Sequence, residues 1–256
     1  MHPRSSGFTL IEVAIVLTIL AMLAGGLLVP LSDSLERSRR NNAEQELREQ
    51  ILPALLGFSA STPDVPHLPC PDCRRNGGGN CPGGGTAGDG EEDRDGDACA
   101  VAFGALPWAT LGLAATDPWG SRYSYGVFAD YADADDDKGV ELSDNDPDLY
   151  ITRGTLADFQ YAVQSNGVAA VVLSHGPNHF GAMAGNLDSG GDPILIGNPP
   201  ASNDDERENL DGDNKFVMRP PADPTLNSSV EEFDDIVVWL SSYRLRGFLV
   251  DAGRLP

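Results

Sequence analysis

Basic residues are scarce in this sequence. Its 256 residues include 17 Lys and Arg against 39 Asp and Glu, a formal net charge of −22. Residues 62–256 hold 12 of the basic and 33 of the acidic residues, so the excess acid lies there. Such a surface repels nucleic acid and anionic lipid and attracts cations. We therefore expect no nucleic-acid partner; a purely solubilising role is the alternative explanation of the acid.

Catalytic signatures are also missing. There is no G-x-S-x-G, no Walker loop, no H-E-x-x-H and no C-x-x-C-H for covalent haem. His175 and His179 flank the turn Gly176-Pro177, so they do not share a helical face. We expect these histidines to cap or pack a loop, with metal binding as the alternative. The sequence does not indicate an enzyme.

Glycine and proline are abundant, at 29 and 19 residues. This composition favours strands joined by turns and loops over a helical bundle. Segments rich in β-branched and aromatic residues predict strands over 122–128, 149–152, 168–173, 193–196 and 235–240, and 245–251 could be a helix or a strand. The expected fold class is α+β, with a long N-terminal helix and an antiparallel β-sheet.

One long apolar run, Phe8–Leu31, follows the short polar leader 1–7. It is long enough to cross a bilayer, and Glu12 is its only charged residue. A secretory signal places its small-residue cleavage site after the apolar core, whereas here the small residue, Gly7, precedes it. A carboxylate within hydrocarbon is costly unless it has a partner, so Glu12 is a functional candidate.

The string Gly7-Phe8-Thr9-Leu10-Ile11-Glu12 resembles the class III signal of type IV prepilins and type II secretion pseudopilins. The resemblance covers about the first 30 residues. It implies that a membrane-bound prepilin peptidase cuts after Gly7 and methylates the new amine on Phe8. It also implies that Glu12 pairs with the N-terminal amine of a neighbouring subunit during filament assembly. An ordinary membrane anchor is the alternative.

After the apolar run, residues 32–58 are expected to continue the helix. Leu47, Ile51 and Leu55 recur every four residues, and Leu52 and Leu56 flank them, which predicts one apolar stripe. A helix over 9–52 would be about 65 Å long. Pro30 suggests a kink or a locally melted turn, and Pro53 suggests another kink or the helix end. The expected parts are the leader (1–7), a transmembrane and filament-core helix (8–31), an amphipathic stem (32–61) and an acidic head (62–256).

Four cysteines, Cys70, Cys73, Cys81 and Cys99, lie in the head. Their even number and an extracytoplasmic setting favour two disulfides, for which three connectivities can be drawn. We favour Cys70–Cys99 with Cys73–Cys81 inside it, and similar pilin-like sequences support a cysteine at the two outer positions. Zinc is the alternative, because Cys70-x-x-Cys73 has ligand spacing.

Acidic clusters in the head suggest calcium. Carboxylates at alternate positions with a turn glycine can supply the oxygens that this cation needs. The first candidate set is Asp93, Asp95 and Asp97; the second is Asp133, Asp135 and Asp137. Neither is a complete EF-hand loop, and solvated loops without a metal are the alternative. Some pseudopilins that resemble this chain hold a structural calcium ion in the head. If a metal binds here, the resemblance therefore implies a structural ion.

The resulting prediction is a structural filament subunit, either a minor pilin or a pseudopilin. Its partners would be other pilin-like subunits, the prepilin peptidase and, before assembly, the inner membrane, with the head outside. Arg37, Arg39 and Arg40 after the apolar run would by charge alone place the N-terminus outside. The resemblance overrides this, because the leader must face a peptidase on the cytoplasmic side. The alternative function is a filament-borne binding module, an adhesin or a substrate-recognition subunit.

Overall fold

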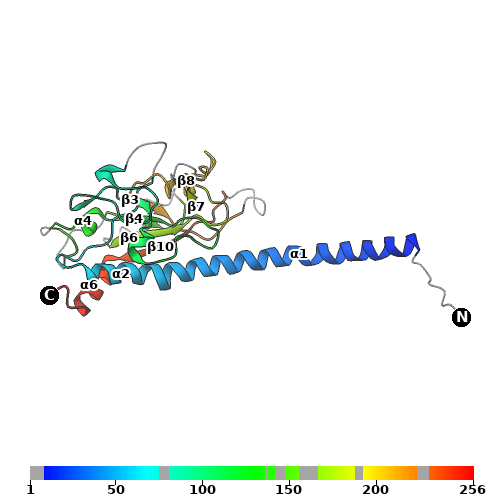
Figure 1. The fold of residues 1–256 in the computed structure, drawn as a ribbon, viewed down its shortest axis with the longest axis horizontal. Helices are drawn as coiled ribbons and strands as arrows, with labels where there is room; N and C mark the ends of the chain where they lie inside the picture. The colour runs from blue at the N-terminus through cyan, green and yellow to red at the C-terminus, as the bar shows by residue number, and fades with distance from the viewer. Residues whose placement is uncertain are drawn as a thin grey trace. The chain divides into compact units, whose positions relative to one another are not determined.

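The structure is a computed structural model that describes residues 9–74, 81–135, 138–141, 148–155, 167–187, 193–223 and 231–256. Within the first helix, the side chains of residues 23–31 and of residue 33 lie outside this description. The chain divides into two compact units, Met1–Asn42 and Ala43–Pro256. The first unit consists of most of one helix, and the second contains the β-structure (Figure 1).

The helices and strands follow one another along the chain in this order. They are α1 (Leu10–Glu46), the π-helical turn η1 (Leu47–Ile51), α2 (Leu52–Ser61), the 3-10 turn η2 (Pro82–Gly84), β1 (Arg94–Asp95), β2 (Ala98–Cys99), β3 (Phe103–Ala105), α3 (Trp108–Leu111), β4 (Ser124–Val127), α4 (Ala129–Ala132), β5 (Tyr150–Thr152), β6 (Val168–Ser174), β7 (Met183–Leu187), β8 (Pro193–Leu195), α5 (Asp204–Glu208), β9 (Lys215–Val217), β10 (Ile236–Ser241) and α6 (Ser242–Asp251).

The long helix is regular through Pro30 and becomes irregular only just before Pro53. In η1 the Leu52 N–H bonds to the carbonyl of Leu47, five residues back. Proline has no N–H, and its ring clashes with the carbonyl four residues earlier in a regular α-helix, which a wider turn relieves. The helix therefore continues past Pro53 instead of ending there. It ends at Ser61, because Thr62 precedes Pro63 and is extended, with ψ 136°.

A four-stranded antiparallel sheet in the order β10-β6-β4-β3 forms the centre of the second unit. One face carries Tyr125, Val172 and Val238, which pack against the helical residues Leu47 and Leu55 in a single apolar core. The predicted stripe on the stem is confirmed, since its five residues are all buried. Figure 1 shows α2 running along this sheet.

The opposite face of the central sheet is covered by a smaller core. Val171 and Leu173 of β6 and Val237 of β10 contact Phe216 of β9 and Ile151 of β5 there. Alternate residues of β6 thus serve the two faces, as the period of two of a strand requires. Being buried on both sides, β6 is apolar up to its last residue, Ser174, and has no exposed position.

Not every expected strand joins the central sheet. The strands over 149–152 and 193–196 do form, as β5 and β8, but β5 pairs in parallel with β9 and β8 pairs with β7, each as a separate two-stranded sheet. The expectation of one antiparallel sheet was therefore too simple. Pairing partners depend on residues far apart in the chain, which local composition does not indicate. The undecided segment 245–251 is helical, as α6, capped by the Ser241 side chain, which accepts the Arg244 N–H.

Candidate functional site

The N-terminal end of α1 holds the predicted assembly residue Glu12. The predicted processing residues Gly7 and Phe8 lie outside the described residues. One Glu12 carboxylate oxygen lies 3.4 Å from both the N–H and the hydroxyl oxygen of Thr9, and the Glu12 N–H lies 3.4 Å from that hydroxyl. This reciprocal arrangement is a capping box. The spacing Thr-x-x-Glu signals it in the sequence, and Thr9 is a residue of this end that was not among the predicted site residues.

The predicted membrane segment, Phe8–Leu31, lies partly outside the description, which excludes Phe8 and the side chains of 23–31. Among the residues that the structure describes, no helix has both the length and the apolar character that a membrane span requires. The described apolar side chains from Leu10 to Met22 are nevertheless largely exposed in the single chain. They are Leu10, Ile11, Val13, Ile15, Val16, Leu17, Ile19, Leu20 and Met22.

All four cysteines are paired in the structure, as Cys70–Cys99 and Cys73–Cys81. This is the connectivity that we favoured among the three. A zinc site at Cys70 and Cys73 is excluded in this state, because no cysteine is left as a thiolate. The outer disulfide ties the segment after the stem to β2, and its Cys70 lies in the core beneath the sheet.

The described aspartates of the first set predicted to bind calcium differ in their surroundings. Asp93 is buried and its Oδ2 accepts the Cys73 N–H at 2.7 Å, whereas Asp95 and Asp97 are exposed. In the part of the chain that the structure covers, no group of three clustered ligand residues combines two of the predicted aspartates. Asp137 lies outside the described residues.

In the second candidate set, a lysine pairs with Asp133. The Lys138 ammonium lies 3.1 Å from Asp133 and 3.5 Å from Asp130, and the Asp135 N–H is donated to Asp133. Burial alone would raise the pKa of Asp133, but the Asp135 N–H and the Lys138 ammonium lower it below its ordinary value. The Lys138 ammonium therefore supplies the positive charge that a bound cation would supply beside Asp133.

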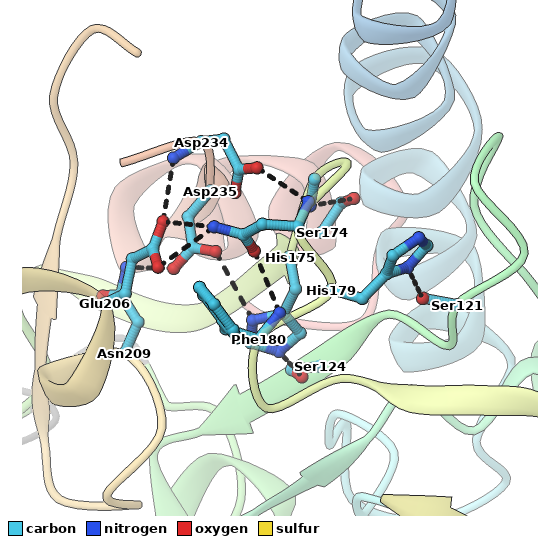
Figure 2. Close-up of polar contacts among 12 residues, drawn as sticks. Ser121, Ser124, Ser174, His175, His179, Phe180, Glu206, Asn209, Asp234 and Asp235 are labelled. Carbon is cyan, nitrogen blue, oxygen red and sulfur yellow. Dashed lines mark hydrogen bonds and ion pairs between the residues drawn. The ribbon is translucent and has the colours of Figure 1, made fainter. Parts of the chain in front are cut away.

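Both histidines pack loops, as expected, and His175 does so inside a buried polar network (Figure 2). Its Nε2 lies 2.7 Å from the Ser124 hydroxyl of β4, and its Nδ1 lies 3.4 Å from Asp235. Asn209 donates to the other oxygen of Asp235 at 2.7 Å. His179, at φ 59°, contacts the Ser121 hydroxyl at 2.7 Å through Nδ1.

The order Ser124, His175, Asp235 has the residue types of a hydrolytic triad, but its surroundings argue for a structural role. Ser124 and His175 are 0% exposed and Asp235 is 3% exposed, so a substrate has no path to the hydroxyl. Arg74 donates to the Ser124 hydroxyl, so the three residues lie in a network that is closed by a further buried side chain. Burial lowers the pKa of Arg74 to about 10, and Asp235 opposes this effect.

A second part of the network holds carboxylates close together. Glu206 accepts from the Asn178 and Asn203 amides and from the Asp234 N–H, while Asp234 accepts the Asn178 N–H at 2.9 Å. Burial, and next the charge of Asp235, raise the pKa of Glu206 to about 7. Burial also raises the pKa of Asp234 to about 8, with Asp235 and Glu206 adding to the effect.

The described residues contain three groups whose side chains lie close enough together to ligate a metal ion. Each group includes side chains that already have bonding partners in the chain. In the first group Asp93 is accompanied by the disulfide-bonded Cys73 and Cys81. The carboxylates of the second, Glu206, Asp234 and Asp235, accept from amide donors of the chain. In the third, Glu208 and Asp213 pair with the Lys215 ammonium at 3.9 and 3.0 Å. These arrangements indicate structural networks.

The comparison with protein families bears on the N-terminal end. Residues 2–28 match the family described as the prokaryotic N-terminal methylation motif. Neither the curated proteins nor the solved structures gave a match. The matched residues include Gly7, Phe8, Thr9 and Glu12. The chain therefore carries a prokaryotic N-terminal methylation motif, consistent with the signal of a type IV pilin-like or pseudopilin precursor.

Proposed function

We propose that this chain is a structural subunit of a type IV pilus or type II secretion filament, cut after Gly7 and methylated on Phe8. The observation that carries this proposal is the methylation motif over residues 2–28, with Glu12 inside an otherwise apolar segment. Before assembly, the segment Phe8–Leu31 anchors the subunit in the inner membrane with the second unit outside. Its apolar side chains then pack with those of other subunits in the filament core.

The described apolar side chains of α1 support this role. Leu10 is 92% exposed and Met22 is 74% exposed, a state that water disfavours. Either lipid or the matching helices of other subunits would cover them. Glu12 then requires a partner in the assembled state, and the amine that cleavage creates on Phe8 of a neighbouring subunit is the natural counter-charge.

The second unit supports a structural role. Its Ser124–His175–Asp235 arrangement is closed to solvent, and its carboxylate groups are served by donors of the chain. The two disulfides suit a protein exposed outside the cytoplasm. A minor rather than a bulk subunit is favoured by the size of the head, 195 residues with long loops.

The second candidate function is a filament-borne binding module. Two open pockets on the second unit favour it, one of about 470 Å³ and one of about 250 Å³. Copy number in sheared filaments bears on this choice. An abundant chain would be a bulk structural subunit, whereas a sparse chain would be a minor or an adhesive subunit.

The decisive experiment is to identify the N-terminal peptide by mass spectrometry in membrane and sheared-surface fractions of the native host. A peptide that begins with N-methylated Phe8 in the sheared fraction is expected. An uncleaved chain that begins at Met1 or His2 and stays in the membrane fraction would contradict the proposal, and an ordinary membrane anchor would then be the function of the segment.

A further inference from the structure

The C-terminal helix α6 presents an exposed aromatic and basic face. Leu245 and Leu249 are fully buried against the core, whereas Tyr243 is 72% exposed and Phe248 and Val250 are 38% and 40% exposed. Arg244 lies beside Tyr243 and is also exposed. Within the described residues, no carboxylate forms an ion pair with Arg244. Tyrosine and arginine are the residues that most often carry the binding energy of protein interfaces.

This face differs in charge from the rest of the head. Residues 242–256 contain three arginines and one aspartate, whereas residues 62–241 contain nine Lys and Arg against 32 Asp and Glu. Arg246 contacts Tyr131 and Arg254 donates to the carbonyls of Thr62 and Asp64, so Arg244 supplies the positive charge of the exposed face. A basic, aromatic face on an otherwise acidic molecule is complementary to the other surfaces of the same molecule. Complementary charge steers two proteins together and selects the register in which they meet.

A pocket of matching character lies on another part of the second unit. It has a volume of about 470 Å³ and is open to solvent, beside α5 and the segment after β8. Its lining includes Asp204, Glu208 and Asp211 together with Arg207 and the apolar residues Pro199 and Leu210. Glu208 and Asp213 pair with the Lys215 ammonium, whereas Asp211, which lines the pocket and is exposed, has no ion pair among the described residues.

The face and the pocket cannot meet within one molecule. α6 belongs to the apolar core on the helix side of the central sheet, through Leu245 and Leu249. The pocket belongs to the other side, because α5 packs against β9, and Phe216 of β9 lies in the core of the opposite face. In Figure 1, α6 lies beside α2 at the lower edge of this unit and β8 lies at its upper edge.

We propose that the exposed face of α6, led by Tyr243 and Arg244, docks into the acidic pocket around Glu208 and Asp211 of a second copy of this chain. Because the two surfaces differ, the contact is head-to-tail. A head-to-tail contact leaves a free face and a free pocket at its ends, so it joins any two neighbouring copies without closing them as a two-fold dimer. The inference deepens the proposed filament function and rests on it for its biological setting.

The test places a photo-crosslinking residue at the centre of the face. The full chain is expressed in the native host as two differently tagged copies, with Tyr243→p-benzoylphenylalanine in one of them. After irradiation, we expect a crosslinked species that contains both tags, and its crosslinked peptide should come from residues 198–211. The species is measured in both membrane and sheared fractions.

A charge swap makes the test specific to the two surfaces. Arg244→Glu in the copy that carries the crosslinker should lower the yield of the two-tag species about fivefold, the effect of losing one favourable charge pair. Asp211→Arg in the other copy should restore most of the yield. The matched control is Arg153→Glu, which makes the same change at an exposed arginine directly after β5 and should leave the yield unchanged.

Crosslinks only to lipid or to a different protein, no crosslink at all, or a two-tag crosslink that the charge swap does not affect would each overturn the inference. If N-methylated Phe8 is present in the sheared fraction while the two-tag species is absent, the filament function stands and the head-to-tail contact fails. If the chain stays uncleaved but the charge-sensitive two-tag species forms in the membrane, the contact stands and the filament function fails.

Discussion

Tyr123 and Glu46 link the central sheet to the helix through one hydrogen bond. The Tyr123 hydroxyl donates to the Glu46 carboxylate at 2.7 Å, and the tyrosine ring is buried. Burial, and then this hydrogen bond, raise the pKa of Tyr123 above its ordinary value. The two residues are 77 positions apart, so the contact contributes to the register between helix and sheet.

Replacing Tyr123 tests the strength of this link. Tyr123→Phe should lower the free energy of unfolding by about 1.5 kcal/mol, because a charged acceptor loses its buried donor. Urea denaturation of the full chain in detergent measures the change. Glu46→Gln is the matched control: its amide oxygen still accepts from the tyrosine, so the loss should be smaller. An unchanged free energy of unfolding in Tyr123→Phe would show that the hydrogen bond does not matter.

Asp234 makes stability depend on pH. Its pKa is raised from 3.8 to about 8, so the folded state binds its proton more tightly than the unfolded state does. The stabilising effect is complete below the unfolded pKa and is lost as the pH rises through about 4 to about 8. Glu206, with its pKa raised to about 7, acts in the same direction.

Asp234→Asn should therefore flatten the fall in stability between pH 4 and pH 8. At pH 8, the free energy of unfolding of the variant should exceed that of the unchanged chain by on the order of 2 kcal/mol. The amide oxygen of the new asparagine can still accept the Asn178 N–H. Urea denaturation across this pH range measures it. The exposed Asp64→Asn serves as control and should leave the profile unchanged. A variant whose profile runs parallel to that of the parent would contradict the assignment.

The polar network shows which residues sequence reasoning could not bring together. Ser124, His175 and Asp235 come from β4, from the residue after β6 and from the residue before β10. Their spacing of 51 and 60 positions carries no local signal. Only the antiparallel pairing of β4 and β10 with β6 brings their side chains to one face of the sheet.

At the level of elements, the two disulfides close loops of different length. Cys70–Cys99 spans 29 residues and Cys73–Cys81 spans 8. A longer closed loop removes more conformational freedom from the unfolded chain. Replacing Cys70 and Cys99 together by alanine should cost about 3.5 kcal/mol, and the same replacement of Cys73 and Cys81 about 2.5 kcal/mol. Thermal unfolding of both double variants measures the order, and the reverse order would contradict it.

Strong local patterns predicted the elements well. The apolar stripe on the stem is buried, and strands form in all five predicted segments. These segments have the period and composition that their elements need. The sequence predicted a kink or a helix end at Pro53 but not the wider turn at η1. A proline is compatible with several local backbone conformations, and the packing of Leu47, Ile51 and Leu55 on the sheet selects one of them.

At the scale of the whole molecule, Glu12 bears on assembly. Glu12→Ala should leave cleavage after Gly7 intact, because the peptidase site precedes it, but impair incorporation into the filament, because the amine on Phe8 loses its counter-charge. Immunoblots of membrane and sheared fractions measure both steps. Thr9→Val is a useful comparison, since it removes only the capping hydroxyl. Normal amounts of the Glu12→Ala chain in sheared filaments would contradict the assigned role.

The sequence alone determined the features that are local. The methylation motif, the apolar segment with its single carboxylate and the helical stripe each depend on residues close together in the chain, so spacing reveals them. Tertiary structure decided what depends on distant residues: Asp93 faces Cys73 instead of Asp95, Asp133 faces Lys138, and β5 pairs with β9. Asp93 and Asp133, two of the carboxylates that suggest a cation site in sequence, find donors within the fold, because a buried charge must be compensated and the nearest donors of the chain do so.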